Sequence, residues 1–412
     1  MCFLLKVLLK KMRIFIIIAG IFMYSCHNHQ GLKKVPEAPD MVTLNVNPDL
    51  NSKLYYSSFI DSIAYIQLQT PEGVLIGSNA RKVIFSRNQY FLFDENKVYV
   101  FNSNGKYLYD IGKRGNGPGE LNWLENFTVD TTRNSVDIIS LANRKVVRYD
   151  INNGNFIDEF TTKFYVGNIY SRRDGNYLLY ASSASDSSAE EIDNLVIYDA
   201  QKEFILESVL GQPIYMKNYQ GVSNNAFSNT DKGVLFTRCL DNNIYLISGN
   251  EVSIKYKIDY GQKYELPTDK KFYNKFEDLG QIMDQTDYPI QFSGHLGNKQ
   301  VLYYNYLIHK KQFAVLYDII HSILLNGRGI NDFDNGPDYF MIGLYQNQLI
   351  GITEPSTFIR HFKKMQKQMN KSDWLQYLND HPQIVSILET SHAQDNPILA
   401  VCYMKNKFKP AE

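Results

Sequence analysis

The chain has 412 residues, of which 30 are Tyr and 24 are Phe, and aromatic side chains pack best on the pleated surface of a sheet. Its 43 Lys and Arg balance 43 Asp and Glu, so the net charge provides no global field that would attract a polyanion or an acidic membrane surface. We therefore expect a strand-rich fold and no nucleic-acid partner.

Residues 1–25 have the features of a secretory signal. Basic residues precede an apolar run, 14–23, that is too short for a bilayer span of about 20 residues. The run leads to Ser25 and Cys26, and a small residue directly before Cys is typical of a lipoprotein signal whose Cys is acylated. We therefore expect a lipid on Cys26. Simple cleavage is the alternative, because the two residues before Ser25 are not the usual small aliphatic ones.

We interpret residues 26–55 as a stalk. Residues 27–40 contain His, Asn, Gln, Gly and two Pro without a hydrophobic period, as expected of a flexible linker. His27 and His29 are candidate metal ligands, but nothing nearby supplies a third ligand. A solvated linker is therefore the favoured interpretation of this segment.

The cysteines do not indicate a disulfide framework or a zinc site, because they are few and widely scattered. Cys239 and Cys402 lie in apolar, strand-like runs, which favours buried small side chains over a bridge between them.

A short pattern recurs about every 49 residues: an apolar strand ending in an aromatic or aliphatic residue, a polar turn, and a second apolar strand. The copies begin at Val98, Val146, Leu195 and Ile244. A fifth copy, around Tyr317, arrives late because an amphipathic helix is inserted near residues 268–285, with Thr268 as its expected N-cap.

Each repeat contains about four short strands, which is the size of a propeller blade. Five blades are expected to begin near Arg81, Asn126, Tyr165, Ala226 and Gln291. A sixth is assembled from three strands near the C-terminus, with residues 62–69 as its outermost strand, and this pairing closes the ring. The sequence therefore predicts an all-β, six-bladed β-propeller over residues 56–408, closed by an N-terminal strand, with helical inserts near 268–285 and 356–392.

Four segments carry a resemblance to a known family. They are SIAYIQLQTPEGVLIG from Ser62, VYVFNSNGKYLYDIGKRGNGPGELNWLENFTVD from Val98, GRGINDFDNGP from Gly327 and DNPILAVCYMK from Asp395. With them, the chain resembles the six-bladed β-propeller lipoproteins of Gram-negative envelopes, relatives of NHL-repeat and TolB-like propellers. The resemblance implies a binding or envelope-associated role and supplies no catalytic residues. In such lipoproteins an acidic stretch after the Cys marks surface export. Residues 27–30 contain no acid, so we expect the periplasmic side of the outer membrane.

Two Gly-rich connections between blades carry the candidate ligand-binding residues. These residues are Arg114, Asn116, Glu120, Arg328, Asp332 and Asp334. Connections of this kind cross one face of a propeller, so the six side chains are expected to converge near the central channel. In the alternative interpretation, the glycines and prolines shape the turns and the charged residues tie adjacent blades together.

Residues 331–336 also look like a fragment of a calcium loop, because hard cations take clustered carboxylate and carbonyl oxygens. The segment lacks the terminal Glu of an EF-hand. Calcium therefore stays an alternative, and no cofactor is predicted.

The sequence contains no HExxH or GxSxG motif. We therefore expect a non-enzymatic binding or scaffolding protein, anchored in the envelope, that uses a propeller face or the channel mouth to hold a glycan, a peptide or a protein partner. The alternative is a propeller enzyme of the lyase or lactonase type, with a metal or a His/Asp/Arg site in the channel. Fold alone does not choose between them.

Overall fold

The computed structural model describes residues 35–77, 80–94, 97–181, 192–211, 224–267, 269–277 and 279–409. Val35–Glu412 form a compact unit of their own. The predicted signal, the lipidation site at Cys26, and His27 and His29 lie outside the described residues.

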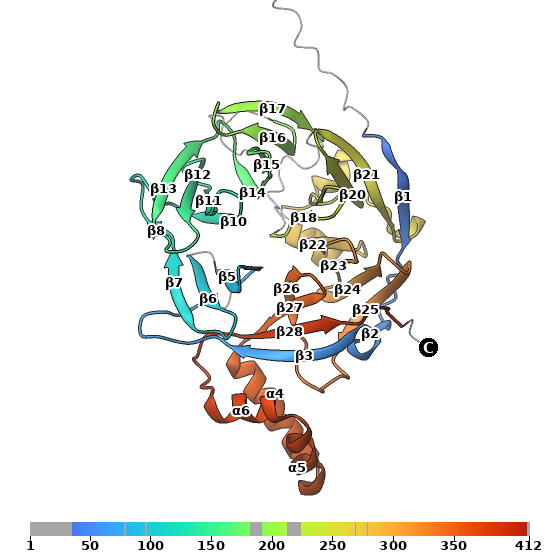
Figure 1. Ribbon diagram of the computed structural model, residues 1–412. Coiled ribbons are helices and arrows are strands. Elements are labelled where there is room, and N and C mark those ends of the chain that lie inside the picture. The colour runs from blue at the N-terminus through green and yellow to red at the C-terminus, as the bar shows by residue number, and fades with distance from the viewer. Residues whose placement is uncertain are drawn as a thin grey trace, which may run out of the picture. The chain divides into compact units, whose positions relative to one another are not determined.

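Six sheets are arranged in a ring (Figure 1), which confirms the six-bladed β-propeller. Blade 1 contains β4 (Lys82–Ser86), β5 (Gln89–Phe93), β6 (Val98–Asn102) and β7 (Tyr107–Ile111). Blade 2 contains β10 (Leu124–Asp130), β11 (Ser135–Ser140), β12 (Lys145–Asp150) and β13 (Phe156–Thr161). Blade 3 contains β14 (Val166–Ser171), β15 (Tyr177–Ala181), β16 (Leu195–Asp199) and β17 (Phe204–Val209).

The remaining three blades complete the ring. Blade 4 contains β18 (Phe227–Asn229), β19 (Val234–Phe236), β20 (Asn243–Ser248) and β21 (Glu251–Asp259). Blade 5 contains β22 (Ile290–Gly297), β23 (Val301–Ile308), β24 (Lys311–Asp318) and β25 (Ile323–Ile330). Blade 6 contains β26 (Phe340–Tyr345), β27 (Gln348–Thr353), β28 (Ile398–Met404) and β3 (Ile60–Gln67).

The core lies between the blades, because each sheet is covered on both faces by its neighbours. The second and third strands of a blade are therefore almost wholly buried, as in β16, whereas outer strands such as β13 are largely exposed. Aromatic side chains join neighbouring blades: the rings of Tyr180 in blade 3 and Phe236 in blade 4 meet edge to face, with centroids 5.2 Å apart.

The ring closes where the N-terminal strand β3 pairs with the last strand of the chain. β3 runs antiparallel to β28, with Ile66 opposite Leu399 and Ala64 opposite Val401. This confirms the predicted closure, and it joins the two ends of the propeller in one sheet.

Two further strands lie within the segment that was expected to be a stalk. β1 (Glu37–Asn45) pairs parallel to β21 of blade 4, and β2 (Lys53–Tyr55) pairs parallel to β25 of blade 5. Asp40 of β1 forms ion pairs with Lys232, at 2.6 Å, and with Lys255, at 2.8 Å. Two strands of the predicted stalk therefore belong to the sheets of blades 4 and 5.

Two helical inserts interrupt the blades, as predicted. The first contains α2 (Lys270–Tyr273) and α3 (Leu279–Gln285), while Thr268, its expected N-cap, lies outside the described residues. The second contains α4 (Pro355–Gln368), α5 (Lys371–Asp380) and α6 (Pro382–Thr390) between β27 and β28, and it lies outside the ring beside β3 (Figure 1). Among the described residues, no helix combines the length and apolar character needed to cross a membrane.

Candidate functional site

The first predicted loop is fastened to blade 2. It carries the short strands β8 (Lys113–Arg114) and β9 (Glu120–Leu121). The Glu120 carboxylate forms an ion pair of 2.7 Å with Lys113 and accepts a hydrogen bond of 3.0 Å from the Gly117 N–H. Asn116 accepts a hydrogen bond of 3.0 Å from the Asn122 side chain, and Arg114 is exposed. The polar contacts of Glu120 and Asn116 therefore stay within the loop.

One glycine explains part of the unusual sequence of this loop. Gly119 has φ +67°, and a Cβ at this position would lie 2.7 Å from the ring of Phe156 on β13. Its N–H donates to Glu159, also on β13, over 3.0 Å. Only glycine allows the loop to approach the outer strand of blade 2 so closely.

The second predicted loop joins blades 5 and 6 to the N-terminal segment. Asp332 accepts hydrogen bonds from the backbone N–H and the hydroxyl of Ser57, at 2.8 and 2.5 Å. Asp334 accepts from the Tyr65 hydroxyl on β3 and, over 2.9 Å, from the Gly336 N–H. Arg328 lies on β25 and borders a separate cavity of about 440 Å³.

The contacts of the two loops are therefore separate: the first bonds to blade 2, and the second to the segment around Ser57 and Tyr65. The carboxylates of Asp332 and Asp334 also accept from different partners instead of facing one shared point. In the described ranges, no three His, Cys, Asp or Glu side chains are grouped to hold a metal. The contacts of Asp332 and Asp334 tie their loop to the segment around Ser57 and Tyr65, whereas those of Asn116 and Glu120 stay within their own loop.

Polar side chains bridge the inner strands at one end of the ring. The side-chain amides of Asn126 in blade 2 and Asn168 in blade 3 both donate to the backbone oxygen of Asn224, just before blade 4, over 3.1 and 2.9 Å. Lys82 of blade 1 donates 2.8 Å hydrogen bonds to the Asn126 side chain and the Phe127 oxygen. These contacts connect the inner strands of blades 1, 2 and 3 with one another and with the residue that precedes blade 4.

Two titratable groups near the axis are shifted towards their neutral forms by burial. Desolvation lowers the pKa of Lys82 to about 7 and that of His295 on β22 to about 3. His295 Nδ1 lies 3.2 Å from the Thr237 hydroxyl, and its Nε2 has no hydrogen-bond partner among the described residues. Neither residue lines the large cavity described next.

A cavity of about 1020 Å³ lies at the opposite end of the inner strands, where each strand turns back into the second strand of its blade. We call it the mouth. The turns of blades 3, 4, 5 and 6 and a residue after β28 supply its polar lining. These residues are Arg172, Arg173, Asp174, Asn229, Thr230, Asp231, Lys232, Asn298, Lys299, Gln300, Gln346, Asn347 and Asn406. Four blades thus contribute to a single hollow.

The cations of the mouth differ in their partners. Arg172 forms a 2.6 Å ion pair with Asp174, and Lys232 is held by Asp40 of β1. Arg173 in blade 3 and Lys299 in blade 5 are exposed, and in the part of the chain that the structure describes they form no ion pair. These two positive charges are therefore available to a ligand.

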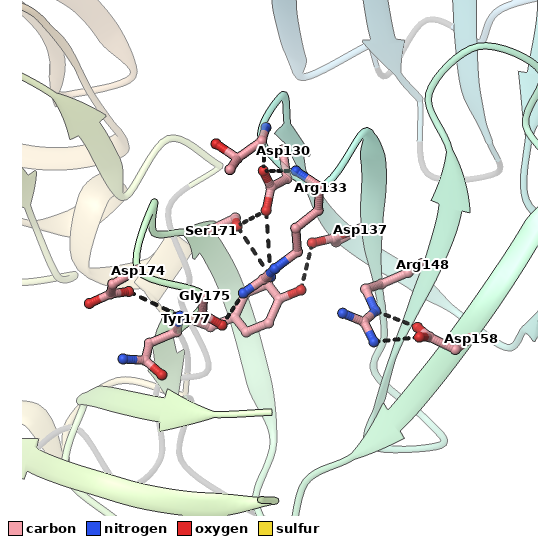
Figure 2. Close-up of polar contacts among 11 residues, drawn as sticks. Asp130, Arg133, Asp137, Arg148, Asp158, Ser171, Asp174, Gly175 and Tyr177 are labelled. Carbon is pink, nitrogen blue, oxygen red and sulfur yellow. Dashed lines mark hydrogen bonds and ion pairs between the residues drawn. The ribbon is translucent and has the colours of Figure 1, made fainter. Parts of the chain in front are cut away.

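A polar network between blades 2 and 3 positions one edge of the mouth (Figure 2). The Arg133 guanidinium donates to the backbone oxygen of Gly175 and lies over the ring of Tyr177, 4.7 Å from its centroid. The Ser171 hydroxyl donates to Asp130 over 2.5 Å. Because Ser171 and Gly175 flank the turn that carries Arg172 and Arg173, these contacts fix that turn.

The same network contains a fully buried carboxyl group (Figure 2). Asp137 on β11 accepts a 2.8 Å hydrogen bond from the Tyr177 hydroxyl on β15. Desolvation raises the pKa of Asp137 to about 6, and the Tyr177 hydrogen bond offsets only part of this effect. Beside it, Arg148 on β12 forms a two-pronged ion pair with Asp158 on β13.

The sequence suggests a channel mouth as a binding place but does not identify the residues of this cavity, because they occupy short Asn-, Asp- and Gly-containing turns that resemble ordinary hairpin turns. One available signal was the recurrence of arginine after the inner strands of the first three blades. These residues are Arg87, Arg133 and Arg172.

Comparisons with known proteins support the fold. No curated protein matches the sequence. A candidate exported protein from Bacteroides fragilis NCTC 9343 superposes with a TM-score of 0.66 at 19% identity, over 89% of this chain and 99% of that one. A DUF4221 family member from Bacteroides vulgatus ATCC 8482 gives a TM-score of 0.49 at 9% identity, over 84% of this chain and 98% of that one. The first likeness supports the fold alone, and the second is too distant for any argument.

A family model covers nearly the whole propeller. It is that of DUF4934, described as a domain of unknown function, and it matches residues 41–403. This range begins within β1 and ends within β28, so it contains all six blades. The chain therefore belongs to the DUF4934 family.

Proposed function

We propose that this protein is an exported, envelope-anchored binding protein that holds a glycan in the mouth of its propeller. The observation that carries the proposal is the lining of the 1020 Å³ cavity, to which four blades contribute amide, hydroxyl and charged side chains. Such groups both donate and accept hydrogen bonds, as the hydroxyl groups of a sugar require. The cavity is also large enough for a small oligosaccharide.

The cavity also contains an aromatic side chain. Tyr170 lines it and is half-buried, and an aromatic ring suits the carbon face of a sugar ring. Leu178, Val234 and Ile247 lie buried behind this lining. A peptide or a protein partner would find fewer apolar anchors there than hot spots usually provide. We therefore favour a glycan over these two alternatives.

The lyase or lactonase alternative receives no support from the mouth. The described residues that line it include Asp and Arg but no His, Cys or Glu, so a His/Asp/Arg site would be incomplete there. The buried His295 and Lys82 do not line the cavity. Binding without catalysis is the simpler use of this lining.

Export is supported by the secretory features of residues 1–25 and by the Bacteroides fragilis relative, which is described as a candidate exported protein. We propose that a lipid on Cys26 anchors the chain to the outer membrane, on its periplasmic side. Metabolic labelling with a fatty acid tests this step: the wild-type chain should be labelled and a Cys26→Ser variant should not. Labelling of both proteins, or of neither, would refute the anchor.

The binding proposal is tested by titrating the purified protein with a panel of neutral and acidic oligosaccharides in a calorimeter. We expect binding to at least one of them, and a loss of about tenfold or more in a triple variant, Gln300→Ala, Asn347→Ala and Asn406→Ala, because two or three hydrogen bonds are removed. The matched control is Asn51→Ala with Asn104→Ala, two exposed amides outside the cavity. Absence of binding across the panel, or equal weakening in the control, would contradict the proposal.

A further inference from the structure

The helix α4 presents a strongly cationic face to solvent. Four basic side chains are exposed along its 14 residues, and the helix contains no Asp or Glu. These side chains are Arg360, Lys363, Lys364 and Lys367. A helix of this length is about 20 Å long, so the charges are dense.

The cations and the apolar residues lie on opposite sides of α4. Phe358 and Phe362 are fully buried against α5, α6 and β28, and Met365 packs beside them. On a helical surface, positions three and four apart are neighbours. Residues 358, 362 and 365 therefore form the attached face, and 360, 363, 364 and 367 form the opposite one.

The cationic face is not neutralised by the protein. In the described part of the chain, none of its four side chains forms an ion pair, although Arg360 donates a 3.1 Å hydrogen bond to the Thr357 hydroxyl. Two acids of the neighbouring helix α5 have other partners: Asp373 accepts a hydrogen bond from Asn370, and Asp380 accepts one from Gln376.

The spacing of the cations makes the face self-repelling. Arg360 and Lys364 are four positions apart, as are Lys363 and Lys367, and like charges at this spacing destabilise a helix. Most surface helices relieve such repulsion with interspersed acids. A binding surface for anions explains why α4 has none.

We propose that the cationic face of α4 docks on an anionic lipid surface. Four basic residues on one helix match the size of clusters that bind acidic headgroups, each adding to the attraction. The face carries no aromatic side chain to stack on a base, because Phe358 and Phe362 are buried beneath it, so it lacks the usual features of a nucleic-acid site. The helix lies outside the ring, beside β3 (Figure 1), and is therefore accessible to a surface. The proposal does not require the lipid on Cys26.

The test uses residues 35–412, the compact unit that contains all six blades and lacks Cys26. Sedimentation with vesicles measures its binding to an equimolar mixture of phosphatidylglycerol and phosphatidylcholine, and to phosphatidylcholine alone. We expect binding to the anionic vesicles only, and weaker binding as salt is added. Replacing all four cations with Gln (R360Q, K363Q, K364Q, K367Q) should lower the affinity more than about 100-fold.

A charge-matched control separates this face from the net charge of the protein. The variant K106Q, K257Q, K275Q and K407Q removes the same number of exposed charges from other elements, and it should bind like the wild type. Equal loss in both variants, or no loss in either, overturns the proposal. Binding to a soluble sulfated polysaccharide but not to vesicles also overturns it and assigns the face to a soluble polyanion.

Misfolding is checked by thermal melts. The quadruple variant should melt at the wild-type temperature or above, because the repulsion along α4 is removed. If it does not fold, the double variant K364Q and K367Q is the substitute, with an expected loss of about tenfold or more. Wild-type affinity in a folded double variant would contradict the proposal.

Discussion

Asp137 shows how burial changes the chemistry of a single side chain. It lies in the second strand of blade 2 and is completely inaccessible to solvent. Its carboxylate accepts a hydrogen bond from the Tyr177 hydroxyl of blade 3. Desolvation disfavours its charged form and raises its pKa from 3.8 to about 6. This carboxyl group therefore links two blades at the expense of stability at neutral pH.

The sign of the pH effect follows from the raised pKa. A carboxyl with a higher pKa in the folded than in the unfolded chain stabilises the fold when protonated, and this stability is lost as the pH rises from about 4 through about 6. A difference of about two pKa units corresponds to about 3 kcal/mol in the free energy of unfolding. His295 acts in the opposite direction, because its pKa is lowered to about 3.

We predict that Asp137→Asn stabilises the protein near neutral pH and leaves it almost unchanged near pH 4. The amide keeps an oxygen that accepts from Tyr177 and cannot ionise. Urea unfolding of both proteins at about pH 4 and about pH 8 measures the difference, from which the contribution of His295 cancels. The control Asp158→Asn weakens the exposed ion pair with Arg148 and should lower stability at about pH 8. An equal effect of Asp137→Asn at both pH values would refute this explanation.

At the scale of elements, the strands that repeat were predictable and the strands that do not repeat were not. Blade 3 was expected near Tyr165 and blade 4 near Ala226, and their first strands begin at Val166 and Phe227. The recurring apolar pattern fixes these positions because every blade needs two buried inner strands. By contrast, β1 adds one parallel strand outside blade 4, and its apolar residues alternate only between Val42 and Val46.

The charged loops were identified in sequence, but their contacts were not predictable. The loop that contains Asp332 meets Ser57, 275 residues earlier in the chain, and a pattern along the sequence contains no information on such a partner. The residues of the mouth were not predicted for a related reason: each of the four blades contributes only two to four polar residues, and these become a site only when the ring closes.

The second helical insert is held to the ring by a small core of its own. Phe362 is fully buried, its ring centroid 4.8 Å from that of Phe358 and 6.2 Å from that of Tyr377. The insert connects β27 to β28 outside the blade sheets, so its loss does not remove any strand. Local unfolding of such a unit is possible without global unfolding.

We predict that Phe362→Ala releases the insert while the propeller persists, because truncating a buried Phe costs about 3–5 kcal/mol. Limited trypsin digestion should cut α4 at its lysines much faster than in the wild type, as mass spectrometry of the fragments would show. The main thermal transition should remain. Gln366→Ala, at an exposed position of the same helix, serves as the control and should be cut at the wild-type rate. Global unfolding of the Phe362 variant would show that the insert and the ring form one cooperative unit.

At the scale of the whole molecule, the net charge is zero, but the folded chain has surface regions in which positive charges cluster. Its 43 basic and 43 acidic residues balance, and composition alone therefore argues against an anionic partner. The structure nevertheless groups unpaired cations on α4 and at the mouth, while many acids are used in ion pairs elsewhere, such as Asp158 with Arg148. Folding therefore places basic residues together on parts of the surface, and the overall composition does not reveal this distribution.

The two exposed cations of the mouth make a specific prediction about its ligand, which depends on the proposed binding function. Arg173 belongs to blade 3 and Lys299 to blade 5, so only the closed ring brings them to the same cavity. Charge-assisted hydrogen bonds are about twice as strong as neutral ones, so an acidic sugar that reaches both cations should bind more tightly than its neutral analogue.

Replacing both Arg173 and Lys299 with Gln should reduce the affinity for the acidic glycan about tenfold or more and leave the affinity for the neutral analogue nearly unchanged, as measured by calorimetry. The control K106Q with K407Q removes two exposed charges outside the cavity, and it should preserve the preference. Equal loss for the acidic and the neutral glycan would mean that the cations only shape the turns, whereas a selective loss would identify charge recognition across two blades.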